Sequence, residues 1–167
     1  RATWGMALAH LGVAITLFGI TASGALTREL LVNLRLGESA AVAGYTMKLV
    51  DVAPVAGANW TALEATLDVS RAGKPVTVLH PQARLYTSPM MDTTEAAIHT
   101  RLNGDLYAVL GKPDGSGRWQ LHVWWKPFVV WIWAGGLIMA LGGGLSMTAR
   151  ASARRSAAEP VGALVAA

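Results

Sequence analysis

Residues Ala2–Thr27 read ATWGMALAHLGVAITLFGITASGALT and contain no Asp, Glu, Lys or Arg. This run is longer than the roughly 20 apolar residues that cross a bilayer as a helix. One ionisable side chain, His10, lies within it. Because an ionisable group at membrane depth is costly, it usually has a partner, a bound ion or a cofactor. The alternative is a neutral imidazole that forms a hydrogen bond with a neighbouring helix.

The residues around His10 leave room for a flat macrocycle. Side chains three and four positions apart share one face of a helix, and near His10 these are small or apolar. Ala7, Ala14 and Thr21 give that helix a shallow flank. A metal porphyrin is therefore allowed at His10, although these residues do not demand one.

The composition indicates a membrane protein. Of the 167 residues, 53% are hydrophobic and only 14% are charged, well under the quarter that is usual for soluble domains. The chain runs from Arg1 directly into an apolar span, so we expect it to be part of a longer protein. It has no cysteine, and therefore no disulfide or thiol chemistry of its own.

A second uncharged run, Phe128–Met147, is also long enough to span a membrane. Tryptophans gather near its start and mark one headgroup level: Trp124, Trp125, Trp131 and Trp133. An arginine-rich tail, Ala149–Arg155, follows it, and the positive-inside rule places that tail in the cytoplasm. Membrane orientation explains the basic excess better than nucleic-acid binding does. Two spans then place both chain ends inside and residues 28–126 outside, which in a bacterium is the periplasm.

The sequence predicts a membrane α plus all-β fold with four parts. These are a transmembrane helix over 1–27, a periplasmic domain over 28–126, a second transmembrane helix over 127–148, and a basic, disordered tail over 149–167.

The predicted periplasmic domain consists of short strands. Apolar and polar residues alternate in Leu30–Leu36 and Trp60–Ser70, and turn residues such as Gly44 and Gly73 separate the strands. One short helix is expected around Thr93–Ile98. Short strands with frequent turns favour a small antiparallel β-barrel or sandwich.

Both spans carry small residues at helical spacing, which let helices approach closely in lipid. In the first span they are Ala9, Gly12, Thr16, Gly19 and Ser23, and in the second they are Gly136, Ala140 and Gly144. We expect these residues to serve packing, with further helices supplied by another part of the protein.

The remaining motifs add no catalytic chemistry. His80, His99 and His122 have no metal-ligand spacing, so a solvated or structural role is favoured for each. The sequence contains no G-x-S-x-G, Walker loop, H-E-x-x-H or C-x-x-C motif, so hydrolase, NTPase and thiol-redox functions lack support.

The segment Trp4–Ala14 resembles a membrane histidine segment of the CcmF-type cytochrome c haem lyases. Three further stretches agree with that family in order and spacing: Thr94–Ile98, Asp105–Tyr107 with Leu110-Gly111, and Lys126–Trp133. The glycine-rich end Met139–Gly143 is similar too. The resemblance covers most of residues 4–147, and it is to the C-terminal part of the family only.

This resemblance implies a multi-pass protein of the bacterial inner membrane that takes part in cytochrome c maturation. Such proteins receive haem from the haem chaperone CcmE, attach it to apocytochrome c, and work with CcmH/CcmI-type proteins. They also hold a permanent haem b between two transmembrane histidines. His10 matches one of these axial ligands to the haem iron. The second ligand lies upstream, so this segment alone is not expected to be an active lyase.

Two alternatives remain open from the sequence. One is the paralogous haem lyase subunit that serves cytochrome c nitrite reductase. The other is a non-enzymatic, membrane-anchored β domain that positions partner proteins. A spectrum separates the second from the haem lyases, since a pure scaffold should show no b-type haem band.

Overall fold

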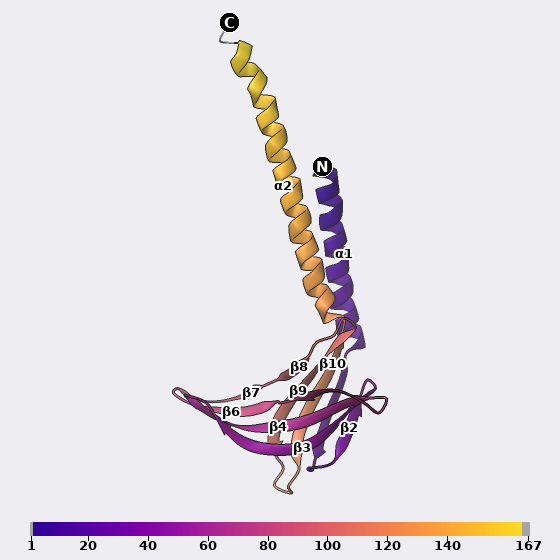
Figure 1. Cartoon of the computed structure of the whole chain (residues 1–167), viewed down its shortest axis with the longest axis vertical. Coiled ribbons are helices and arrows are strands. Elements are labelled where there is room, and N and C mark those ends of the chain that lie inside the picture. Colours follow the sequence, from indigo (N-terminus) through magenta and orange to yellow (C-terminus); the bar gives the residue numbers. More distant parts are fainter. Residues whose placement is uncertain (1, 165–167) are drawn as a thin grey trace. The chain divides into compact units, whose positions relative to one another are not determined.

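The computed structural model describes residues 2–164, and the chain forms two compact units (Figure 1). The first unit comprises residues 1–22 and 128–167 and contains most of helix α1 (Ala2–Leu26) and all of helix α2 (Val129–Leu164). Both helices include a stretch long and apolar enough to cross a membrane, Thr3–Leu26 in α1 and Val129–Ala149 in α2. The second unit, residues 23–127, contains all the strands.

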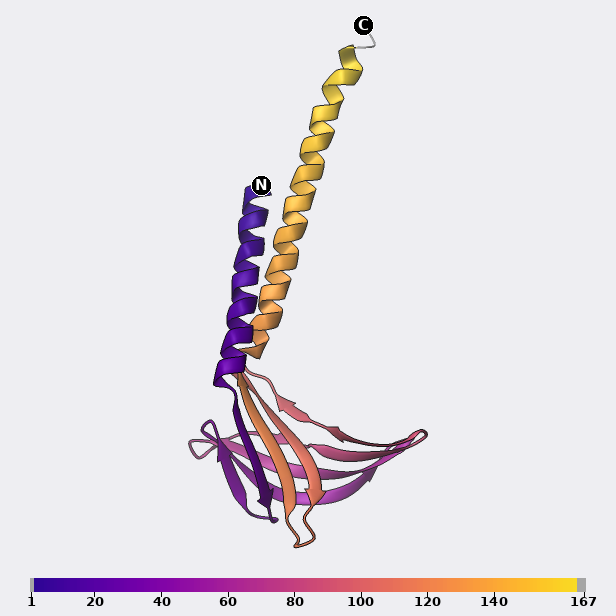
Figure 2. The same ribbon diagram turned by 180° about the vertical axis from the view of Figure 1, so that it is seen from behind.

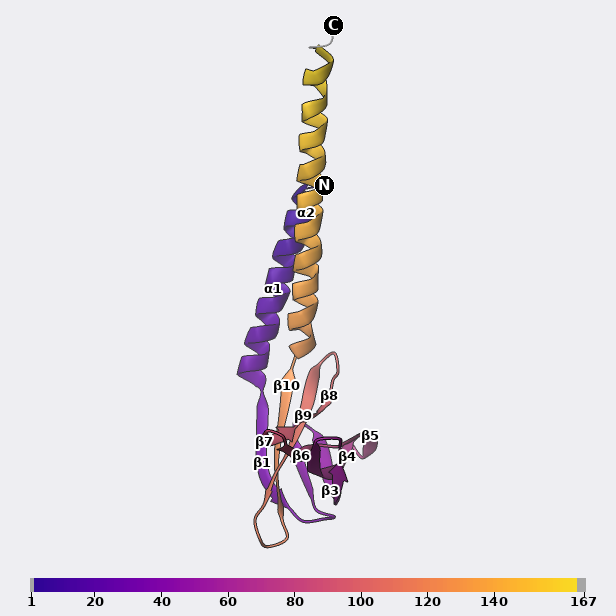
Figure 3. The ribbon, with the colours of Figure 1, turned by 90° about the vertical axis from the view of Figure 1, so that its left-hand side faces the viewer.

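Within residues 2–164, ten antiparallel strands form two sheets. They are β1 (Arg28–Leu34), β2 (Ser39–Val42), β3 (Tyr45–Ala56), β4 (Trp60–Arg71), β5 (Lys74–Leu79), β6 (Gln82–Thr87), β7 (Met90–Glu95), β8 (Ala97–His99), β9 (Gly104–Pro113) and β10 (Trp119–Pro127). One sheet has the order β1-β10-β9-β8, and the other has the order β2-β3-β4-β6-β7 with β5 paired to β4. Figure 3 shows the two layers, with β1 and β10 opposite β3 and β4. The prediction of an antiparallel β domain is confirmed.

The core lies between the two sheets because alternate residues of each strand point inward. Its fully buried side chains include Leu49 of β3, Leu67 of β4, Leu106 and Leu110 of β9, and Leu121 of β10. Figure 2 shows the long strands β3 and β4 curving across the strands of the smaller sheet. This curvature, a consequence of strand twist, makes the domain a half-open sandwich.

Two tight hairpin turns fix the register of the larger sheet. Ala43-Gly44 joins β2 to β3, and Ala72-Gly73 joins β4 to β5, with positive φ at both residues of each pair. Such two-residue turns match the right-handed twist of the strands, and glycine adopts a positive φ without strain. The turns predicted at Gly44 and Gly73 are therefore confirmed.

Two expectations differ from the structure. The short helix predicted around Thr93–Ile98 is wrong, because these residues belong to β7 and β8. The tail 149–167 was expected to be disordered, but α2 continues to Leu164. That segment is rich in alanine, the best helix former. Residues 165–167 lie outside the described residues.

The sandwich carries its own core, so we expect residues 23–127 to fold alone with a strand-dominated circular dichroism spectrum. The Leu67 side chain has no exposed surface. The substitution Leu67→Ala should therefore lower the free energy of unfolding by about 2–5 kcal/mol. Leu31→Ala is the matched control, since the Leu31 side chain is mostly exposed. A helical spectrum, or equal losses in urea titrations of the two variants, would contradict this description.

Candidate functional site

The two helices pack closely through glycine. A Cβ atom added to Gly12 would lie 2.5 Å from the backbone nitrogen of Met139 and 2.6 Å from the carbonyl oxygen of Gly135. A Cβ added to Gly142 would lie 2.4 Å from the backbone nitrogen of Ala9. These distances are shorter than any real carbon contact, so only glycine permits this approach of the helix backbones.

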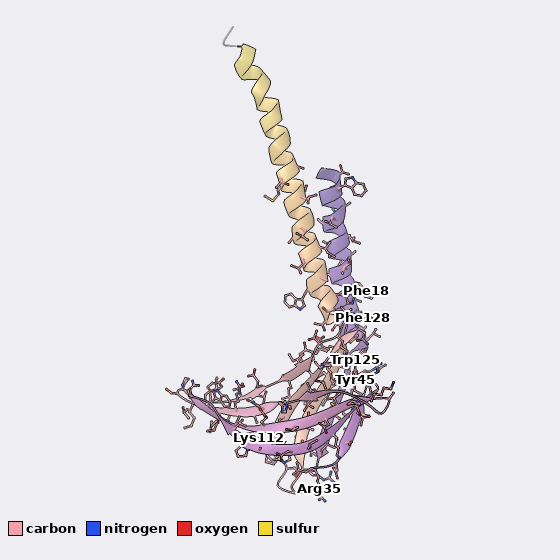
Figure 4. All side chains as sticks on the ribbon, in the orientation of Figure 1. Phe18, Arg35, Tyr45, Lys112, Trp125 and Phe128 are labelled. Carbon is pink, nitrogen blue, oxygen red and sulfur yellow. The ribbon has the colours of Figure 1, made fainter. Side chains whose placement is uncertain are left out.

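The contact repeats every seven residues on both helices, as expected where helices pack side by side. On α1 it involves Gly5, Gly12 and Gly19, and on α2 it involves Gly135 and Gly142. A ring contact between Phe18 and Phe128, with centroids 5.4 Å apart, lies near one end of this contact (Figure 4).

The glycines predicted to pack on α1 contact α2, whereas the glycines predicted to pack on α2 do not contact α1. A Cβ added to Gly136 or Gly144 would have nothing within 4 Å, so those residues face away from α1. Glycines are adjacent at Gly135-Gly136 and at Gly142–Gly144, which gives two stripes offset by one or two residues. Only the stripe that contains Gly135 and Gly142 packs against α1.

The imidazole of His10 is held by its own helix. Its Nδ1 lies 2.8 Å from the backbone carbonyl oxygen of Met6. Because that oxygen can only accept, Nδ1 donates its proton to it, which leaves Nε2 as the ring nitrogen that can offer a lone pair. Among the described residues Nε2 has no partner. The carbonyl of Met6, one turn away on the same helix, therefore holds one ring nitrogen of His10.

His10 faces away from α2. At about 100° per residue, it lies roughly 140° around the helix from Gly5, which contacts α2. His10 is exposed, and so are Ala7 and Ala14 on the same face. The result is a shallow surface with one free imidazole nitrogen on it.

These residues fit an axial haem ligand and its supporting surface. Metal-binding histidines commonly donate their other ring N–H to a carbonyl, which fixes the tautomer and the ring orientation. His10 has this arrangement, and the alanines beside it leave space for a planar group. Residues 129–167 contain no histidine, so α2 has no second imidazole to offer. A second histidine ligand would have to come from outside these two helices.

The histidines of the sandwich each have a local neighbour. His80 lies 3.6 Å from a carboxylate oxygen of Glu64. His122 pairs with Glu29 and stacks on Trp124, with ring centroids 3.6 Å apart. Within the part of the chain that the structure describes, no three metal-binding side chains come together. A structural role therefore remains the simplest interpretation of both residues.

The third of these histidines, His99, lies close to Arg101. Its Nε2 accepts a hydrogen bond of 3.0 Å from Nε of Arg101. Burial and the neighbouring guanidinium lower the pKa of His99. The ring is therefore neutral over a wider pH range than a free histidine, in keeping with a structural role.

A buried acid, Asp105, was not singled out as a site residue by the sequence. It is 5% exposed, and the hydroxyl of Tyr107 donates a hydrogen bond of 3.5 Å to its Oδ2. Burial and the Asp105 carboxylate raise the pKa of Tyr107. Among the described residues, neither Oδ1 of Asp105 nor Nε1 of Trp125 has a hydrogen-bond partner. In the sequence, the sign of a buried acid at this position is a charged residue at the start of an apolar strand.

Two apolar helices that pack through glycine, with a two-sheet antiparallel domain between them in the sequence, define a membrane-anchored β-sandwich protein. Residues 25–127 match the family described as the CcmF C-terminal beta-sandwich. The chain belongs to the CcmF family of cytochrome c-type biogenesis proteins and corresponds to its C-terminal region. The family and the two apolar helices together mark a membrane protein.

Comparison with similar proteins shows what share of a full-length family member this chain covers. It is 46% identical over 161 residues to the cytochrome c-type biogenesis protein ccl1 of Rhodobacter capsulatus, covering 93% of this chain and 25% of that protein. It is 46% identical over 140 residues to CcmF of Escherichia coli, covering 84% of this chain and 22% of CcmF. A solved structure of the cytochrome c haem lyase CcmF matches with a TM-score of 0.68 and 25% identity, over 83% of this chain and 23% of that one. The chain thus spans about a quarter of the length of these relatives.

Proposed function

We propose that this chain is the C-terminal part of a haem lyase of cytochrome c biogenesis, in which His10 is an axial ligand to a transmembrane haem b. The observation that carries the proposal is the free Nε2 of His10, on a ring whose Nδ1–H is bound to the carbonyl of Met6. When bound, the haem supplies a redox-active iron centre in the membrane. The protein's contribution is to hold the ligand ring in one tautomer and one orientation.

The glycine contact between α1 and α2 supports the role of His10 as a haem ligand, although the glycines themselves do not touch His10. Because Gly12 and Gly142 allow the two helices to pack closely, α1 presents the His10 face outward from a rigid pair. We infer that this face is covered by the rest of the protein, which supplies the second ligand and shields the haem from lipid.

We further propose that the sandwich lies in the periplasm, where haem from the chaperone CcmE is attached to apocytochrome c in a complex with CcmH/CcmI-type proteins. The tryptophans at the start of α2 and the arginines after its apolar part support this orientation in a bacterial inner membrane. The absence of cysteine is compatible with chemistry in which the thiols belong to the substrate.

A single cysteine tests the orientation. Ser116 lies between β9 and β10, in an exposed turn whose backbone is organised by Asp114. In the full-length protein with its other cysteines replaced, Ser116→Cys should react with a membrane-impermeant maleimide in intact spheroplasts. Ser156→Cys in the basic tail should react only after lysis. The reverse pattern would contradict the proposed topology.

The experiment that tests the function as a whole is a haem spectrum of the full-length protein, together with cytochrome c assembly in a deletion strain. A b-type band and failure of c-type cytochromes without the protein are expected. A scaffold would show no such band, and the paralogous branch would affect the nitrite reductase cytochrome alone.

A further inference from the structure

The edges of the two sheets separate where β7 and β9 diverge (Figure 2). β8, which follows β7 after one residue, pairs with β9 only along Leu106–Ala108. Among the described residues, β9 has no strand partner on this side after Ala108, and β7 has no partner other than β6. Two strand edges without a partner strand therefore border this opening between the sheets.

An apolar groove of about 700 Å³ lies in this opening. Its floor is the inward face of the larger sheet, with Leu63 of β4 and Ala83 and Leu85 of β6, and Leu110 of β9 forms one wall. Leu63 is 37% exposed and Leu85 is 40% exposed, whereas Leu110 on the opposite wall is fully buried. The sandwich core thus continues into a surface that the smaller sheet does not cover.

Opposite charges lie on the two walls of the groove. Lys112 follows Leu110 on the inward face of β9 (Figure 4), and Asp92 lies on β7 opposite Leu85. Within residues 2–164, neither side chain forms an ion pair or a hydrogen bond. By contrast, the nearby Glu95 is 3.2 Å from Arg84 and already neutralised. Lys112 and Asp92 are available to a ligand.

We propose that this groove binds an extended polypeptide segment of another protein, which adds as a further strand to the free edge of β9 beyond Ala108 and so lies over the floor formed by β4 and β6. Such strand addition gains affinity from main-chain hydrogen bonds and specificity from alternate side chains. The segment carries apolar side chains at alternate positions, directed at Leu63 and Leu85, an acidic side chain beside Lys112 and a basic side chain beside Asp92.

The strand edges favour a polypeptide over a small apolar molecule. A compact ligand could cover the leucines but would leave the backbone N–H and C=O groups of β9 beyond Ala108 without a partner strand, whereas a peptide satisfies both. This inference does not depend on the haem assignment, because all the residues that carry it belong to the sandwich.

The test uses full-length protein in nanodiscs and a fluorescent nonapeptide that alternates valine with threonine and carries glutamate at one end and lysine at the other. Saturable binding by fluorescence anisotropy is expected. Leu85→Glu should weaken it by roughly tenfold or more, since it places a charge against the apolar side chains. Leu31→Glu, on the exposed face of β1, is the matched control and should bind as the unchanged protein does.

Two further comparisons isolate the charges and the backbone. The double variant Lys112→Glu, Asp92→Lys should weaken binding several-fold, and a peptide with its end charges exchanged should restore it. Lys74→Glu, at the exposed start of β5, should have no effect. A peptide N-methylated at alternate residues keeps its side chains but loses backbone N–H hydrogen-bond donors, so it should not bind.

Three results would overturn the proposal. One is no binding of the peptide by the folded protein, and another is equal binding of the N-methylated peptide. The third is a protein dimer that Leu85→Glu dissociates and that excludes the peptide, because the groove would then be an interface between two copies.

Discussion

Replacing His10 by alanine in the full-length protein should remove or strongly destabilise its b-type haem and lower cytochrome c assembly. The physical reason is the single free nitrogen, Nε2, on a ring held through Met6. Alanine offers no ligand, but it is the best helix former and is compatible with lipid, so α1 should persist. The haem content and the reduced-minus-oxidised optical spectrum of the purified protein measure the effect.

Two companion variants make this prediction specific. His122→Ala removes an imidazole of the sandwich that pairs with Glu29, and it should leave the b-type band unchanged. His10→Met replaces one iron ligand with another and should retain part of the haem with an altered spectrum. If His10→Ala kept a normal six-coordinate b-type spectrum, His10 would not be the ligand and would be a helix-bound structural histidine.

One methyl group should destabilise the helix pair when it is placed at Gly12, but not when it is placed at Gly136. At Gly12 the new Cβ would lie 2.5 Å from a backbone nitrogen of α2, so the helices must separate. Overpacking of this kind costs about 1–3 kcal/mol or more. At Gly136 the space is open, and alanine should gain about 1 kcal/mol in helix propensity.

The two variants are therefore expected to shift the thermal unfolding midpoint of the detergent-solubilised, full-length protein in opposite directions. Gly12→Ala should lower it, and Gly136→Ala should leave it unchanged or raise it. Because α1 carries His10, Gly12→Ala should also increase the rate of haem loss. Equal midpoints for the two variants would show that the glycine contact does not hold α1 and α2 together.

Local signals were sufficient for much of the fold. The apolar runs predicted both helices, since their length and lack of charge are properties of the segment itself. Gly44 and Gly73 predicted hairpin turns, because a positive φ is a local requirement. His10 could be selected for the same reason, as the cost of an ionisable group within an apolar run does not depend on the rest of the fold.

Features decided by distant partners could not be predicted in this way. Asp92 and Glu95 have the spacing of a helix cap, yet Thr93 and Thr94 between them pair with β6, and this pairing makes the segment a strand. The choice of Gly135 over Gly136 for helix packing depends on where Gly12 lies.

The groove beside β7 also lies beyond local signals. It exists because β8 pairs with only part of β9, which no local pattern reveals. The same applies to the buried Asp105, whose surroundings come from two different strands.

The most direct test of the central claim is an experimental structure of the full-length protein with its haem bound. We predict that the iron lies at bonding distance from Nε2 of His10, with the Nδ1–H still donated to the carbonyl of Met6. The haem should lie on the side of α1 opposite α2, over Ala7 and Ala14. A haem iron bound elsewhere, with His10 Nε2 bound to another side chain, would contradict the account.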